Sequence, residues 1–155
     1  MREFVVSIER DFKPRFLLKD VPGLSPGPVR TVFDGSMPLR PKAMVSFPSP
    51  GSSWENFAIQ AVPDKSGSAL GAKRSARGYV VVLTFYRNYS DRSEQRLTAY
   101  PQNPGQTPSL LWAGDLDRDG RIDLLLNVET TEAAGSTYHL YLSSRAKQGE
   151  LVGLA

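Results

Sequence analysis

The sequence contains no cysteine and only one histidine, and these two shortages exclude several kinds of site. Without cysteine the chain can form neither disulfides nor thiolate metal sites, and it has no cysteine nucleophile. The single histidine, His139, excludes a multi-histidine zinc site within one chain. A metal site in this protein would therefore have to be built mainly from oxygen ligands.

Long apolar runs are also missing. No segment approaches the roughly 18 consecutive apolar residues that indicate a membrane-spanning helix. The first residues, MREFVVSIERDFKPRF, carry a charge every few positions and lack the apolar core of a signal peptide. We therefore expect no transmembrane segment, and either a cytoplasmic protein or one whose signal peptide has been removed.

The composition is otherwise that of a globular domain. The chain has 155 residues, of which 40% are hydrophobic and 23% charged, enough for one domain with a sizeable core. Its 13 glycines and 12 prolines favour turns and short elements over long helices.

Short β-type runs recur between turn signals along the whole chain. They cover residues 3–9, 28–33, 43–47, 54–62, 79–86, 95–100, 109–114, 122–128 and 137–143. This spacing predicts a single all-β domain over 1–155, a β-sandwich or open barrel of short antiparallel strands. The apolar run YVVVLTFY, 79–86, should be a central strand paired with 95–100, whereas DGSMPLRPK, 34–42, should be a loop.

The stretch GDLDRDGRID, 114–123, is the clearest candidate site. Asp115, Asp117, Asp119 and Asp123 stand at positions 1, 3, 5 and 9 of a loop, and the backbone carbonyl of Arg121 is at position 7. In calcium loops, alternate positions turn their oxygens inward, a glycine at position 6 permits the bend, and the position-7 carbonyl adds a ligand. Such a set of oxygens suits Ca²⁺ better than Mg²⁺, which prefers to keep its waters.

Two other interpretations of this loop lead to different expectations. It is not an EF-hand, because Leu126 occupies position 12, where that loop needs a bidentate Glu. The alternative without a metal is a solvated acidic turn in which Arg118 and Arg121 neutralise the neighbouring carboxylates. The flanking segments look like strands, so we expect a calcium-binding strand–loop–strand.

The stretch LLWAGDLDRDGRIDLLLN, 110–127, resembles the Asp-rich repeat of FG-GAP (integrin-like) and VCBS proteins. The resemblance implies calcium bound by the four aspartates and the Arg121 carbonyl, an extracellular or periplasmic location, and a role in adhesion or recognition. Those proteins are commonly β-propellers, but a single copy in 155 residues cannot close a propeller. The resemblance therefore implies the metal-binding loop for this chain, but not the propeller fold.

The remaining residues give weaker indications of function. The basic residues are scattered, apart from Lys73, Arg74 and Arg77, which argues against nucleic acid. No catalytic residue is assigned, because no nucleophile and base can be grouped around His139. Exposed aromatics among Trp54, Tyr86, Tyr89 and Tyr100 would suit a glycan or protein partner, although core or rim packing is the commoner role.

The sequence thus predicts a calcium-binding extracytoplasmic β-domain that acts as a binding or structural module, with an unknown protein or glycan as its partner. The alternative is a small hydrolase in which the calcium is only structural.

Overall fold

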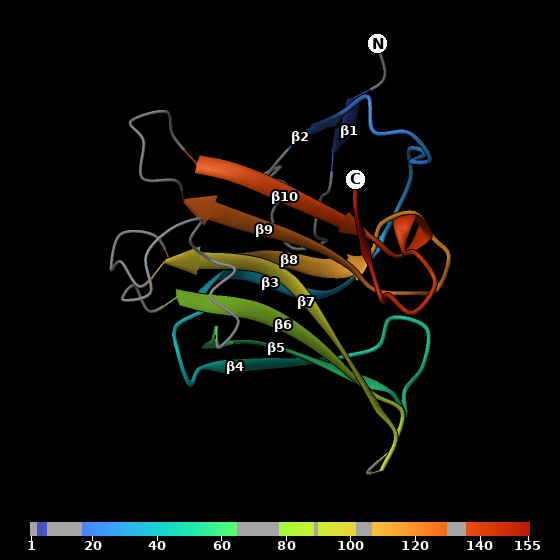
Figure 1. The fold of residues 1–155 in the computed structure, drawn as a ribbon. Coiled ribbons are helices and arrows are strands. Elements are labelled where there is room, and N and C mark those ends of the chain that lie inside the picture. The colour runs from blue at the N-terminus through green and yellow to red at the C-terminus, as the bar shows by residue number, and fades with distance from the viewer. Residues whose placement is uncertain (1–2, 6–16, 65–77, 89, 102–106, 130–135) are drawn as a thin grey trace.

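The computed structural model describes residues 3–5, 17–64, 78–88, 90–101, 107–129 and 136–155. The two larger of their three antiparallel sheets stack face to face as a β-sandwich (Figure 1). The predicted all-β sandwich is therefore confirmed. Within this part of the chain, no helical segment has the length and apolar character that a membrane crossing needs.

The four-stranded sheet follows the order of the chain, β4-β5-β6-β7. Its strands are β4 (Met44–Pro48), β5 (Asn56–Pro63), β6 (Gly78–Tyr86) and β7 (Arg92–Pro101). β6 pairs with β5 on one side and β7 on the other, which confirms the predicted central strand and its hairpin. Its three consecutive valines, Val80 to Val82, are all buried.

The five-stranded sheet has the order β11-β10-β9-β8-β3. Its strands are β3 (Arg30–Pro38), β8 (Ser109–Asp115), β9 (Asp123–Glu129), β10 (Ser136–Leu142) and β11 (Gly153–Leu154). A short 3₁₀ helix, η1 (Ser143–Arg145), follows β10 directly. β8, β9 and β10 are consecutive, so this sheet places the acidic loop between two of its central strands.

One prediction about β3 was wrong. The segment expected to begin a loop at Asp34-Gly35 continues as strand through Pro38. Register shifts between Thr31 and Phe33, and between Asp34 and Met37, allow it to follow β8. The turn residues of this segment lie at these register shifts, on the edge strand of the sheet, where proline and glycine are tolerated.

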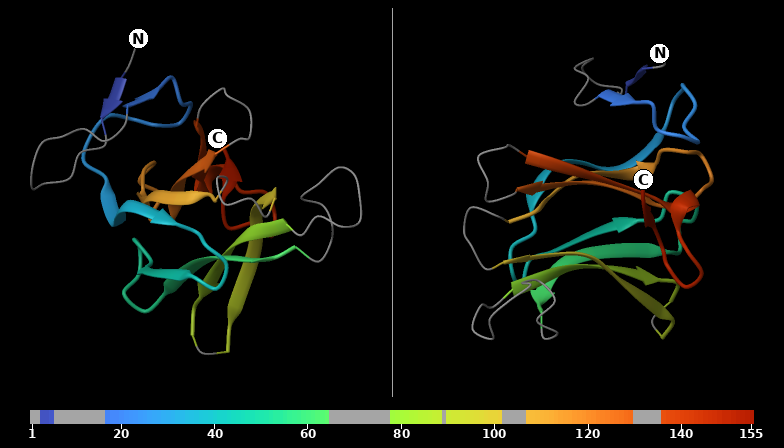
Figure 2. Two further views of the ribbon diagram at one scale, coloured as in Figure 1. Left: turned by 90° about the vertical axis from the view of Figure 1, so that its left-hand side faces the viewer. Right: turned by 45° about the horizontal axis from the view of Figure 1, so that its top comes forward.

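Two apolar clusters lie on opposite faces of the five-stranded sheet. The larger cluster fills the space between the sheets and includes Ile59, Leu83, Leu124 and Leu126. The smaller cluster lies on the outer face, where buried side chains of β8, β9 and β10 contact apolar residues of the segment 18–29. Figure 2 shows the pair β1 (Glu3–Val5) and β2 (Leu17–Lys19) on this outer side, away from the four-stranded sheet.

Trp112 belongs to the outer cluster. Its side chain is 1% exposed, and its indole Nε1–H donates a hydrogen bond to Thr31 Oγ1 at 3.0 Å. It fixes the end of β8 from which the loop begins.

Candidate metal centre

The acidic loop connects the antiparallel strands β8 and β9 as a hairpin. Asp115 is the last residue of β8, Asp123 is the first residue of β9, and Gly114 is paired with Asp123. The predicted strand–loop–strand is therefore present. The pairing brings carboxylates eight positions apart in the sequence to the same end of the hairpin.

Left-handed backbone conformations give the loop its curvature. Gly120 has φ +81°, which favours glycine, and Arg118 has φ +66°. Two aspartates also hydrogen-bond to the backbone two residues ahead. Asp117 Oδ1 accepts from Asp119 N–H at 3.4 Å, and Asp119 Oδ1 accepts from Arg121 N–H at 2.8 Å. These turns hold the loop in a compact form.

Asp123 is the anchor of the loop and is fully buried. Its Oδ2 accepts hydrogen bonds from the backbone N–H groups of Leu116 at 2.6 Å and Asp117 at 3.3 Å. Its Oδ1 accepts from Ser143 N–H at 2.7 Å and from the Ser143 hydroxyl at 3.0 Å. One carboxylate thus ties the start of the loop to the residue that follows β10.

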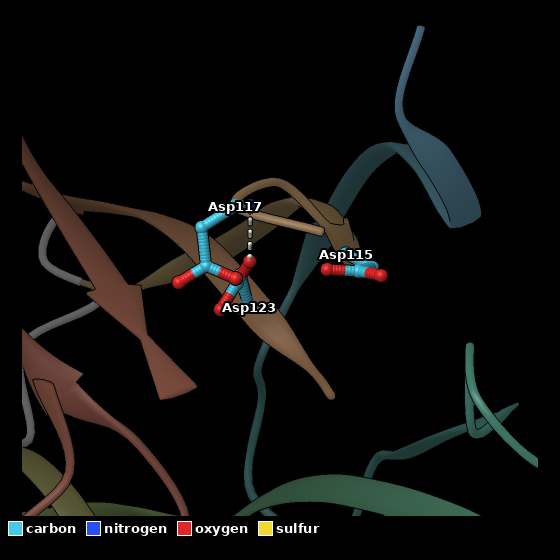
Figure 3. Close-up of side chains that lie close together, drawn as sticks. All are labelled: Asp115, Asp117 and Asp123. Atoms are coloured by element: carbon cyan, nitrogen blue, oxygen red, sulfur yellow. Dashed lines mark hydrogen bonds between the residues drawn. The ribbon is translucent and has the colours of Figure 1, made fainter. Parts of the chain in front are cut away.

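Three of the four aspartates converge. Asp115, Asp117 and Asp123 each offer a carboxylate oxygen, and these oxygens lie within 4.8 Å of one another. Figure 3 shows these side chains and the hydrogen bond between Asp117 and Asp123. This separation suits oxygens that share one cation, because two ligands each about 2.4 Å from an ion cannot be further apart than about 4.8 Å.

Two oxygens in this group are buried without a hydrogen-bond partner among the described residues. Asp115 is only 8% exposed, and its Oδ2 accepts from Gly120 N–H at 3.0 Å, but its Oδ1 has no partner. Asp117 Oδ2 is buried in the same way. A buried carboxylate oxygen without a partner is costly, and a bound cation would satisfy both atoms.

Asp119 has a different environment. Its Oδ2 lies 2.9 Å from the Ser143 hydroxyl, where it competes with Asp123 Oδ1 for the one hydroxyl proton, and the residue is not part of the three-carboxylate group. Of the five residues predicted as ligands, the structure thus brings together Asp115, Asp117 and Asp123. The roles of Asp119 and of the Arg121 carbonyl as ligands stay predictions.

The electrostatics of the loop also favour a cation. Four aspartates and two arginines leave residues 115–123 with a net charge of −2. Burial raises the pKa of Asp115, and it raises the pKa of Asp123 to about 6, although hydrogen bonds from Ser143 and Leu116 act in the opposite direction. Both shifts reflect the cost of an ionised carboxylate that is removed from water.

The arginines of the loop do not form the compensating pairs that a solvated acidic turn would use. Arg118 Nη2 donates to the backbone carbonyl of Ser25 at 3.1 Å, and the Arg121 side chain is exposed. Across the ranges that the structure describes, no ion pair joins either arginine to a carboxylate of the loop. The negative charge of the three converging aspartates is therefore left for another partner.

Ser143 is the residue of this site that the sequence analysis missed. It is 2% exposed and contacts both Asp119 and Asp123 through its hydroxyl. The only signal in the sequence is a serine directly after the apolar strand TYHLYL. Its approach to the loop depends on the pairing of β9 with β10, which could not be established from local pattern.

The other candidates lie away from this site or outside the described residues. His139 is on β10 with its ring 6.2 Å from that of Tyr141, and its Nδ1 has no hydrogen-bond partner in the described part of the chain. Tyr100 is buried, not exposed, and its hydroxyl donates to the Leu39 carbonyl at 2.9 Å. Trp54 is 85% exposed. Tyr89 and the basic residues 73–77 lie outside the described ranges.

Comparison of the chain with family models, with curated proteins and with solved structures finds no match. The described residues form a β-sandwich of two antiparallel sheets with an aspartate cluster at the end of one hairpin.

Proposed function

We propose that this chain is a calcium-binding β-sandwich module in which the ion is structural. The observation that carries the proposal is the pair of buried, unpartnered oxygens, Asp115 Oδ1 and Asp117 Oδ2, beside the carboxylate of Asp123. Carboxylate and carbonyl oxygens are the ligands that Ca²⁺ prefers, and its flexible coordination tolerates a loop of this kind. Asp119 and the Arg121 carbonyl are further ligands in this proposal.

The ion would hold the β8–β9 hairpin to the segment after β10. Asp123 already accepts hydrogen bonds from Leu116 N–H and Ser143 N–H, so a cation shared with Asp115 and Asp117 would fix the hairpin and the segment after β10 at once. All three converging aspartates belong to one short hairpin, and the Asp123 carboxylate is enclosed. We therefore propose stabilisation, not catalysis, as the role of the metal.

The biological role is proposed from the resemblance of residues 110–127 to FG-GAP and VCBS repeats. On that basis the module works outside the cytoplasm in adhesion or recognition of a protein or glycan. A calcium-dependent fold suits such compartments, where the concentration of free calcium allows even a weak site to be filled. No observation at His139 favours the alternative of a small hydrolase.

Isothermal titration of the chelator-treated protein tests the metal directly. We expect one Ca²⁺ per chain to bind, and Mg²⁺ to bind more weakly. At 100 times the dissociation constant, calcium should stabilise the fold by about 2.7 kcal/mol if it binds only the folded state. If the protein, shown beforehand to be metal-free, takes up no calcium and unfolds identically with calcium and with chelator, the proposal is wrong.

A further inference from the structure

A pocket of about 270 Å³ opens beside the acidic loop, on the side facing the four-stranded sheet. Its walls come from the loop between β4 and β5, the segment 120–122 and the chain before β11. The backbones on two of these walls touch, since a Cβ added to Gly51 would lie 2.1 Å from the carbonyl oxygen of Gly120. One wall of this pocket is thus the outer side of the candidate metal loop.

The base of the pocket is apolar. Phe57 and Phe85, on neighbouring strands, have ring centroids 4.9 Å apart and planes tilted by 37°. Ile122 and Leu151 complete this base. Aromatic and aliphatic side chains at this position offer C–H and π surface to a small ligand.

The rim carries charges of both signs in equal number. Arg87 and Arg121 supply guanidinium donors, while Glu55 and Glu150 supply carboxylate acceptors. Arg87 is 63% exposed; its Nη1 pairs with Asp91 at 3.3 Å and its Nε lies 3.7 Å from Glu55, so Nη2 is the nitrogen that remains for a ligand. A simple anion would meet two carboxylates and a simple cation two guanidinium groups. A neutral ligand rich in hydroxyls can use both kinds of partner.

An exposed tryptophan precedes one of these rim residues. Trp54 is 85% exposed and is followed directly by Glu55, which lines the pocket. Trp54 does not itself line the pocket, but the exposure of so large an apolar side chain is typical of binding surfaces. An indole ring also offers a flat face on which the C–H face of a sugar ring can stack.

We infer that this pocket binds one neutral sugar ring, held by the aromatic base and Trp54 and hydrogen-bonded by the charged rim. The volume of about 270 Å³ lies just below the usual range for small-molecule sites, about 300–1,000 Å³, and suits a single ring at the end of a glycan. The inference rests on the proposed function as a binding module and specifies its ligand. It does not require the metal itself to touch the sugar.

Amide NMR spectra of the calcium-treated full chain provide the test. The probes are the methyl glycosides of glucose, galactose, mannose and N-acetylglucosamine, with alanine and N-acetylneuraminic acid as zwitterionic and anionic probes. At least one neutral glycoside should shift signals of residues 55–57, 85–87, 120–122 and 150–151. Trp54→Ala and Arg121→Ala should each weaken its affinity by about tenfold.

Tyr138→Ala is the matched control, because Tyr138 is also exposed, at 62%, but lies on β10. Its affinity should equal that of the unaltered protein. The inference is overturned if no neutral glycoside shifts these signals, if both pocket variants bind like the control, or if only alanine or N-acetylneuraminic acid binds. Calcium uptake is measured separately without sugar. Uptake without glycoside binding would refute only the sugar site, and glycoside binding without uptake would refute only the metal.

Discussion

Ser143 follows Asp123 by 20 residues, yet its N–H donates to Asp123 Oδ1 at 2.7 Å, and its hydroxyl, which has one proton to donate, lies 3.0 Å from the same oxygen. The same hydroxyl lies 2.9 Å from Asp119 Oδ2. This serine therefore connects the acidic loop to the end of β10. The connection needs no metal, so the structural and metal-binding contributions of the loop can be measured separately.

Ser143→Ala should remove the hydroxyl contacts with Asp119 and Asp123 but keep the backbone hydrogen bond. We expect a loss of about 1–3 kcal/mol in the free energy of unfolding, because the hydroxyl bonds to carboxylates in a buried position. Urea denaturation in chelator measures this loss. Ser144→Ala, at the exposed neighbouring position, is the control and should change the stability by less than about 0.5 kcal/mol.

Asp115→Asn should have opposite effects with and without calcium. In chelator the variant should be as stable as the unaltered protein or more stable, because a buried carboxylate near two others loses its charge. With calcium it should be less stable, because the ion loses a charged ligand. Thermal melts in the two buffers measure both effects. Asp91→Asn, on an exposed carboxylate paired with Arg87, should show no such reversal; a reversal there would point to general charge effects.

Asp123→Ala should destabilise the fold even when no calcium is present. The substitution leaves the N–H groups of Leu116 and Ser143 without their buried acceptor. Each unsatisfied buried donor costs about 1–3 kcal/mol, so a loss of about 3 kcal/mol or more is expected. Hydrogen exchange across residues 110–128 should show faster opening. Unchanged protection would mean that the carboxylate does not hold the hairpin.

The titration of Asp123 gives a prediction for pH in chelator. Burial raises its pKa to about 6 in the folded state, above the value of 3.8 expected when unfolded. Between these values the folded state binds more protons, so its stability is greatest at low pH and falls as pH rises through about 6. The change is about 3 kcal/mol in total.

The control for this titration is Asp123→Asn, which cannot ionise at that position. The difference in unfolding free energy between the two proteins should depend on pH between about 4 and 6 in chelator. With calcium present, the slope of the unaltered protein should lessen or reverse, because the ion binds the ionised carboxylates. A pH-independent difference between the proteins in chelator would contradict the shifted pKa.

Local patterns in the sequence predicted much of the fold. Strands such as β5 and β6 were found because apolar alternation and β-branched residues mark buried strands. The end of β3 was missed because turn residues in a bulged edge strand look like a loop. Packing was the commoner expectation for Tyr100, but its partner could not be foreseen, since Leu39 lies 61 residues away and only the packing of the sheets brings them together.

The candidate site was predicted in part for similar reasons. The spacing of the aspartates depends only on the hairpin, so the convergence of Asp115, Asp117 and Asp123 could be anticipated. The turn of Asp119 toward Ser143 could not, because it depends on strand β10. The pocket next to the loop could not be predicted from the sequence either, since its lining comes from four separate segments of the chain.

The contact between Gly51 and Gly120 constrains which sequences this fold can accept. No side chain takes part in it, so no change of rotamer can relieve a collision at this point. A methyl group at position 51 would force the two loops to separate, whereas neighbouring positions such as Ser52 are free of this restriction. In selection experiments, the other positions of the loop between β4 and β5 should therefore accept substitutions more readily than position 51. At this point the approach of the two loops is limited by main-chain atoms, not by side chains.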